Sequence, residues 1–201
     1  MPEPLTAAAL LTISDQFVHV RMMLSILVGL SIARLLTGLA RFVQHPSREQ
    51  VYGPHLAWAL FMLLTVIHYW WAEFNLAQIH TWSFAHYLLL IVYASLLFLI
   101  STLLFPDRMD EYNGFKDYFH ARQRWFFGLL IAMLLTDLAD TLLKGRDYFI
   151  SLGLAYDVWL ALLVSLSGAA LFIASRRFHM IFAIVAVVSS MGLIFYRFDS
   201  L

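Results

Sequence analysis

Residues 125–143 read WFFGLLIAMLLTDLADTLL, an apolar run that carries two aspartates, Asp137 and Asp140, near its end. A helix of about 20 apolar residues is long enough to cross the roughly 30 Å hydrocarbon layer of a bilayer. The stretch therefore predicts a membrane span. Because charged groups inside a membrane are costly, the two carboxylates also mark this span as a place to look for function.

The composition of the whole chain agrees with this interpretation. Of its 201 residues, 62% are hydrophobic and 13% are charged, and the mean hydropathy is +0.77. A soluble domain has about 45–50% apolar and about 25% charged residues. The 13 Lys and Arg balance the 13 Asp and Glu, so no basic field is available for a nucleic acid. The lack of cysteine excludes disulfides, thiolate metal sites and a cysteine nucleophile.

Five further apolar runs have the length of a span, and breaks rich in Pro, Gly or basic residues separate them. The six predicted spans cover residues 22–43, 55–76, 84–105, 125–143, 150–174 and 178–196. The segment from Thr6 to Val20 precedes the first basic residue, Arg21, unlike a signal peptide, and we expect it to remain as an interfacial helix. The sequence thus predicts an all-α, polytopic integral membrane protein with one membrane domain, residues 1–201.

The break between the third and fourth spans is the longest. Residues Met109 to Arg124 place Tyr112, Phe115 and Phe119 at i, i+3 and i+7 among charged residues. This spacing puts the three rings on one face of a helix, so we expect an amphipathic helix on the membrane surface. A docking site for a protein partner is the alternative use of residues 109–124.

Basic residues favour one orientation. The first, third and fifth breaks, with the adjoining helix ends, hold eight Lys and Arg, whereas the N-terminus, the other two breaks and the C-terminus hold four. By the positive-inside rule, both termini then lie on the outer side of the membrane. We expect a bacterial inner-membrane protein in this orientation.

Ionisable residues within the predicted spans are the best functional pointers in such a sequence. They are Arg34, His68, Glu73, His86, Asp137, Asp140 and Asp157. Counting along antiparallel spans places all of them except Arg34 in the outer half of the membrane. Two carboxylates on one helix face in a low dielectric are unfavourable when both are ionised, so we expect a shared proton or a bound cation. The predicted proton or ion site comprises Asp137, Asp140, Glu73, His68 and Arg34.

Structural roles for the same residues remain open. Lys144 follows Asp140 at i+4 and can pair with it. Arg34 can pair with Asp137 or Glu73, in which case the pair only fixes the packing of helices. Losing one partner of such a buried pair is costly in either case.

Tryptophans gather near the end of the second span, at Trp70, Trp71 and Trp82. Tryptophan is common at the membrane interface, so these residues fit an aromatic belt. The alternative is an aromatic-walled pocket over the carboxylates, suited to a cation or a flat ligand.

The candidate ligands of a metal ion are His68, His86, Glu73 and Asp137, with Asp140 as a further one. No spacing such as His-Glu-x-x-His joins them, and His68 and His86 would lie at different depths for the two axial ligands of a haem. We therefore predict no cofactor and keep a metal or a haem as alternatives.

Small residues recur every four positions on two spans. They are Ser25, Gly29, Ala33 and Thr37 in the first span and Ala161, Ser165 and Ala169 in the fifth. Such faces allow helix backbones to approach closely. We expect them to pack within the chain, and we also expect a homo-oligomer, because six spans with little soluble mass leave much surface for self-association.

Three functions fit these observations. The first is a channel or transporter for protons or small cations that uses the intramembrane carboxylates. The second is a non-catalytic scaffold or partner subunit of a larger complex, and the third is a membrane redox or metal-binding subunit. The chain has no nucleophile elbow, Walker motif or kinase signature, which argues against an enzyme. The expected partner is the lipid bilayer, and no nucleic acid is expected.

Overall fold

The computed structural model describes residues 7–44, 52–73 and 83–198, and the regular structure in these ranges is helical. The helices are α1 (Ala7–Gln44), α2 (Gly53–Ala72), α3 (Phe84–Leu104), α4 (Phe115–Leu143), α5 (Arg146–Ser151), α6 (Gly153–Ala170) and α7 (Arg176–Phe198). Six of them contain segments long and apolar enough to cross a membrane: Val18–Gln44, Gly53–Ala72, Phe84–Leu104, Phe115–Leu143, Gly153–Ala170 and Arg176–Phe195. The prediction of an all-α chain with six spans is confirmed.

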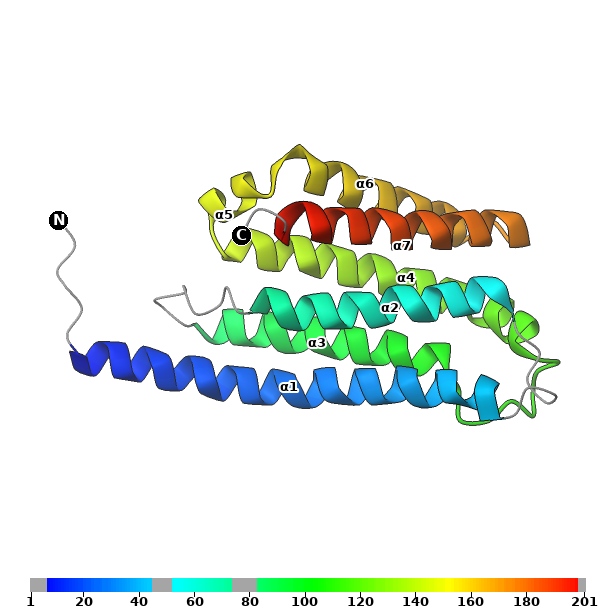
Figure 1. The fold of residues 1–201 in the computed structure, drawn as a ribbon, viewed down its shortest axis with the longest axis horizontal. Helices are drawn as coiled ribbons and strands as arrows, with labels where there is room; N and C mark the ends of the chain where they lie inside the picture. The colour runs from blue at the N-terminus through cyan, green and yellow to red at the C-terminus, as the bar shows by residue number, and fades with distance from the viewer. Residues whose placement is uncertain (1–6, 45–51, 74–82, 199–201) are drawn as a thin grey trace.

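The long helices form one bundle (Figure 1). Helices α2 and α4 lie in its middle, with α1 and α3 on one side and α6 and α7 on the other. Helices α2, α4 and α7 end where α3 and α6 begin, and we call this the Glu73 end because Glu73 follows α2. The opposite end, where α1 and α3 end, is called the Asp107 end. The ionisable residues discussed below divide between these two ends.

The outer surface of the bundle is apolar. Ile26, Trp125 and Ile181 are 58%, 66% and 63% exposed, and many other large apolar side chains are similarly open. In water such a surface would drive association, whereas lipid chains are an apolar solvent that covers it. With six apolar helices and this surface, the chain is a multi-pass helical membrane protein.

Aromatic side chains fill the middle of the bundle. The ring of Trp58 lies 5.3 Å from those of Phe61 and Phe126, 5.4 Å from that of Phe127 and 4.8 Å from that of Phe182, measured between centroids. All five side chains are buried. We call them the aromatic core. Its rings come from α2, α4 and α7, so it fixes the position of these three helices relative to one another.

Residues 109–124 do not form a separate surface helix, so that prediction is wrong. Helix α4 begins at Phe115, after Gly114 with a φ of 99°, and continues to Leu143. Phe115 and Phe119 are buried in the bundle, and the ring of Phe115 lies 4.6 Å from that of His55. Their spacing marks the inward face of the first turns of α4, so these two rings are not available to a partner protein.

The N-terminal segment is likewise not a separate element. Helix α1 runs from Ala7 to Gln44, so the predicted interfacial helix is continuous with the first span. Its placement at an interface and the outer location of the termini stay predictions.

The predicted close packing through small residues is wrong for α1. Ser25, Gly29, Ala33 and Thr37 are all exposed. The close approach of α1 to its neighbour is at Gly38, where an added Cβ would overlap the ring of Phe105. In α6, Ala161 and Ser165 are also exposed and Ala169 is half-buried. The homo-oligomer stays a prediction.

Candidate functional site

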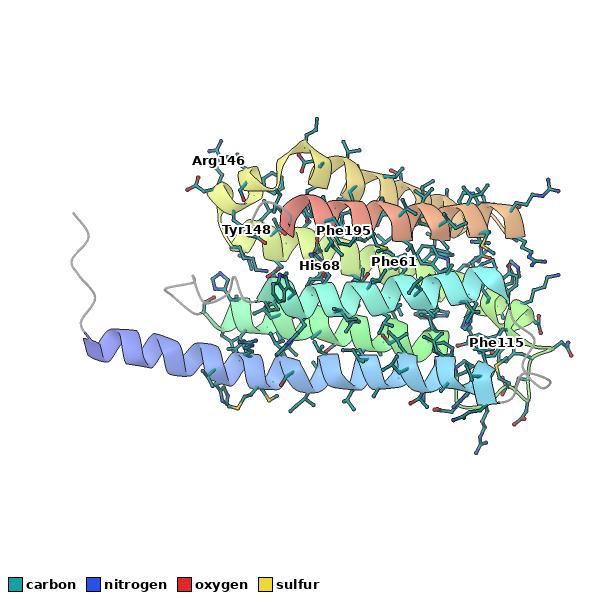
Figure 2. The ribbon with its side chains drawn as sticks, viewed as in Figure 1. Phe61, His68, Phe115, Arg146, Tyr148 and Phe195 are labelled. Carbon is teal, nitrogen blue, oxygen red and sulfur yellow. The ribbon has the colours of Figure 1, made fainter. Side chains whose placement is uncertain are left out.

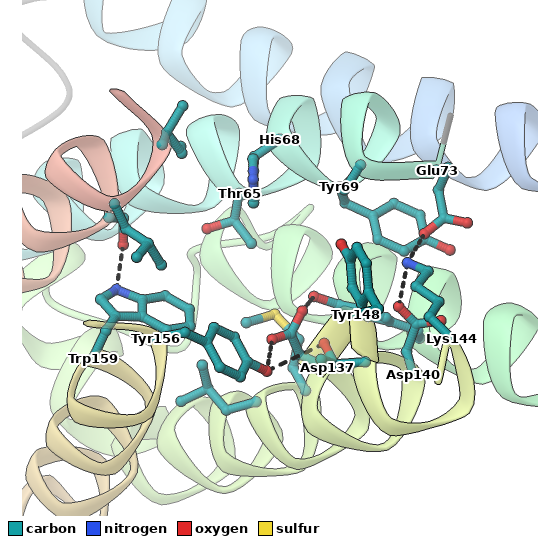
Figure 3. A pocket seen from close by; sticks show the side chains of 18 of the residues that line it. Thr65, His68, Tyr69, Glu73, Asp137, Asp140, Lys144, Tyr148, Tyr156 and Trp159 are labelled. Atoms are coloured by element: carbon teal, nitrogen blue, oxygen red, sulfur yellow. Dashed lines mark hydrogen bonds and ion pairs between the residues drawn. The ribbon is translucent and has the colours of Figure 1, made fainter. Parts of the chain in front are cut away.

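A pocket lies between α2, α4, α6 and α7 toward the Glu73 end (Figures 2 and 3). We call it the acidic pocket because Glu73, Asp137 and Asp140 all line it. Its lining extends along α2 from Glu73 to Phe61, which is roughly 18 Å at about 1.5 Å per residue. This length is a little more than half of the roughly 30 Å thickness of a bilayer. Because Phe61 belongs to the aromatic core, the inner end of the pocket meets that core.

The cavity itself is small. It offers about 50 Å³ to the centres of water-sized molecules, and about 10–15 Å³ by this measure is enough for one water. The acidic pocket therefore has room for a few water molecules or one small ligand.

Asp137 is held by two tyrosines from different helices. The hydroxyl of Tyr93 in α3 donates a hydrogen bond of 2.8 Å to Oδ1 of Asp137, and the hydroxyl of Tyr156 in α6 donates one of 2.8 Å to Oδ2. Tyr156 also lies 3.4 Å from Oγ1 of Thr141, between hydroxyl oxygens. Hydroxyl donors on both oxygens orient the carboxylate and stabilise negative charge on it. Asp137 thereby joins three helices at one point in the pocket.

Asp140 and Glu73 share one lysine. The Nζ atom of Lys144 lies 2.6 Å from Oδ2 of Asp140 and 3.5 Å from Oε1 of Glu73. The pairing of Lys144 with Asp140 at i+4 is confirmed. Glu73 is 1% exposed, and neither of its carboxylate oxygens accepts a hydrogen bond from the described residues. The ion pair at 3.5 Å is therefore a weak partner for so deeply buried a carboxylate.

Glu73 and Lys144 lie one residue beyond the ends of their spans, at Ala72 and Leu143. Burial raises the pKa of Glu73 to about 7, although the Lys144 charge opposes this; the Asp140 charge adds to it. Burial alone would lower the pKa of Lys144, but the charges of Glu73 and Asp140 outweigh it and hold that pKa above its ordinary value. Lys144 is thus a permanent cation, while Glu73 can exchange a proton near neutral pH.

Charge in the acidic pocket is unbalanced. Three carboxylates face one ammonium among the Asp, Glu, Lys and Arg side chains that the structure describes in its lining. If these side chains only held the helices together, we would expect equal numbers of acidic and basic groups, because an unpaired buried charge is costly. The excess of acids therefore favours uptake of a proton or a cation.

Aromatic rings form much of the pocket wall (Figure 3). The rings of Tyr156 and Trp159 are stacked at 6.0 Å between centroids and 29° between planes. The rings of Tyr69 and Tyr93 lie 4.6 Å apart, and Nζ of Lys144 lies 5.8 Å from the centroid of Tyr148. Rings around a cation add a favourable electrostatic contact. The pocket thus has aromatic walls, but Trp70 and Trp71, which were expected to form them, are not part of its lining; tyrosines, Phe61 and Trp159 supply the rings.

The structure brings together four of the five residues of the predicted ion site, since His68, Glu73, Asp137 and Asp140 all line the acidic pocket. His86 lies in the first turn of α3 at the same end, with Nδ1 2.7 Å from Oγ of Ser83. Asp157 is exposed on α6. Trp71 is 53% exposed, as an interfacial belt requires, and Trp82 lies outside the described residues.

Arg34 is not part of this site, and its predicted pairing with Asp137 or Glu73 is wrong. Its guanidinium donates to the carbonyl oxygen of Phe105 at 2.7 Å and forms an ion pair with Asp107 at 2.6 Å. Both partners follow α3 at the Asp107 end. A long arginine side chain extends toward the nearer membrane surface when acceptors are available there, so its depth along the helix was a poor guide to its partner.

Four of the candidate metal ligands line the acidic pocket, but they do not form a metal site. Within the ranges 7–44, 52–73 and 83–198, no group of three or more His, Asp or Glu side chains is arranged to hold a metal ion. Of the predicted set, Asp137 accepts hydrogen bonds from two tyrosines and His86 contacts Ser83. The prediction of a redox or metal subunit gains no support from this geometry.

No protein-family model, curated protein or solved structure matches the chain. Its assignment to the multi-pass helical membrane proteins therefore rests on its own helices, and its function has to be inferred from the acidic pocket.

Proposed function

We propose that this membrane protein is a transporter for protons or small cations and that the acidic pocket is its cation-binding site. The observation that carries the proposal is a cavity lined by three carboxylates, of which Glu73 and Asp140 share the one lysine, Lys144, while Asp137 forms no ion pair among the described residues. Carboxylates that outnumber their basic partners are costly to bury. A cation that binds reversibly among them would explain their presence.

The extent of the pocket favours a transporter over an open channel. The cavity reaches from Glu73 to Phe61 and stops at the aromatic core. A pore that conducts ions needs a polar path through the whole membrane, whereas a carrier exposes its site to one side at a time. A pocket closed on one side by packed rings is the arrangement expected of a carrier with access from the Glu73 end.

The charges suggest how binding and release would be coupled. With Glu73 protonated, Lys144 pairs with Asp140 alone, and the pocket carries less negative charge. When Glu73 loses its proton, the negative charge of the pocket increases and attracts a cation toward Asp137. Proton release from Glu73 and cation uptake at Asp137 would therefore favour one another.

The test is a flux assay with purified protein in liposomes that contain a pH-sensitive dye. We expect a proton or cation flux above that of empty liposomes, and we expect Asp137→Asn to reduce it at least tenfold. Asp157→Asn is the matched control, because it makes the same isosteric change on an exposed position of α6 and should leave the flux unchanged. Liposomes that are no leakier than empty ones with every cation tested would refute the transporter, and the scaffold interpretation would replace it.

A further inference from the structure

The acidic pocket already binds an ammonium group, that of Lys144. This group lies 2.6 Å from a carboxylate oxygen of Asp140, 3.5 Å from one of Glu73 and 5.8 Å from the ring centroid of Tyr148. The side chain of Lys144 is 5% exposed. Carboxylates with an aromatic ring are the usual protein environment for an organic ammonium ion, so the pocket has the chemistry to recognise one.

Asp137 offers the same chemistry without a cation in place. In the part of the chain that the structure describes, it forms no ion pair, and its two hydrogen bonds come from neutral hydroxyls. Each carboxylate oxygen accepts one of these bonds and keeps capacity for another. An ammonium group carries three N–H donors and can therefore bind Asp137 while Tyr93 and Tyr156 stay in place.

The walls next to Asp137 suit an apolar body rather than a hydrated metal ion. Phe61, Met133 and Leu134 line the inner part of the pocket, and Tyr156 and Trp159 stack beside it. Cations such as Ca²⁺ need about six to eight oxygen ligands. Apolar side chains supply none, but they gain free energy when they cover the carbon atoms of a ligand.

We propose that the cation taken up by the acidic pocket is a small primary organic ammonium ion, with its nitrogen on Asp137 and its apolar body against Trp159 and the aromatic core. This inference rests on the proposed function and names the ligand class of the same site. The ammonium of Lys144 then balances one of the two charges of Asp140 and Glu73, and the ligand balances that of Asp137, so that three carboxylates meet two cations.

The experiment compares three probes on the purified full-length protein by calorimetry: ethylammonium chloride, which is small enough for a cavity of about 50 Å³, its uncharged analogue ethanol, and potassium chloride. We expect saturable binding of the ammonium, at least tenfold weaker binding of the alcohol and no saturable binding of potassium. Asp137→Asn should weaken binding of the ammonium at least tenfold, and Asp157→Asn should leave it unchanged. Tyr156→Phe keeps the ring but removes one donor to Asp137 and should weaken binding by a smaller factor.

Two results separate the ligand class from the transport proposal. Flux of protons or potassium in liposomes without binding of the ammonium probe would overturn the ligand class and leave the proposed function standing. Equal binding of the ammonium and the alcohol would also overturn it, because the charge would then contribute nothing. If Asp137→Asn fails to fold, this comparison on the unmodified protein still decides the matter, and absence of both flux and binding would refute both proposals.

Discussion

Replacing Lys144 by methionine tests whether the acidic pocket depends on its one lysine. Met keeps most of the length of the side chain and removes the charge. Lys144 pairs with Asp140 and Glu73, and all three side chains are less than a tenth exposed. Removing one partner of a buried ion pair costs about 3–5 kcal/mol, because it leaves an uncompensated charge. For a chain of this size, that loss corresponds to a decrease in melting temperature of roughly 6–20 °C.

The decrease should depend on pH. Burial raises the pKa of Glu73 from its ordinary value of 4.5 to about 7, so the stability contributed by its neutral form is complete below about pH 4.5 and is lost as the pH rises through about 7. Lys144 opposes this loss, because its charge stabilises the ionised carboxylate. Lys144→Met should therefore be more destabilising at about pH 8 than at about pH 5.

Thermal unfolding in detergent, followed by tryptophan fluorescence at the two pH values, measures both effects. Arg146→Met is the matched control, since Arg146 is an exposed basic residue two positions further along the chain and its loss should change the melting temperature little. A decrease for Lys144→Met that equals that of the control, or that is the same at both pH values, would refute the reasoning.

Three further predictions follow from single contacts. Glu73→Gln should remove most of the decline in melting temperature between about pH 5 and pH 8, because its amide stays neutral throughout; a variant that keeps the slope would show that another group titrates. Arg34→Met and Asp107→Asn should show a coupling of about 0.2–1 kcal/mol in a double-mutant cycle of thermal stability, as expected of a pair with one exposed partner; strictly additive losses would contradict the pair. Gly38→Ala should lower stability by about 1–3 kcal/mol, since its Cβ overlaps the ring of Phe105, and Gly29→Ala, which meets open space, should not.

The spans could be predicted because their signals are local. The length of an apolar run and the Pro, Gly and basic residues at its ends are properties of neighbouring residues, and five predicted spans agree with the structure to within a few residues at most ends. The exception is the start of α4, which lies at Phe115 rather than Trp125. Charged residues from Lys116 to Arg124 ended the apolar run there, but the helix continues because Phe115 and Phe119 pack inside the bundle.

The site could be predicted only where its contacts stay on one helix. Asp137 and Asp140 stood out as acids in an apolar run, and the pair of Asp140 with Lys144 follows from i+4 spacing. The tyrosines that hold Asp137 could not be found this way, because Tyr93 and Tyr156 come from α3 and α6, and the sequence does not give the rotation of one helix against another. The partners of Arg34, Phe105 and Asp107, were missed because they follow the end of α3 and the long arginine side chain reaches them from within the span.

The choice of partners for Asp137 is what favours a binding site over a structural ion pair. A carboxylate whose purpose is to fix helix packing is best served by a cation, which cancels its charge. The chain instead places its pocket lysine between Asp140 and Glu73 and gives Asp137 two hydroxyl donors. Hydroxyls orient a carboxylate and stabilise its charge without cancelling it, so the field of Asp137 remains available to a cation that enters the cavity beside it.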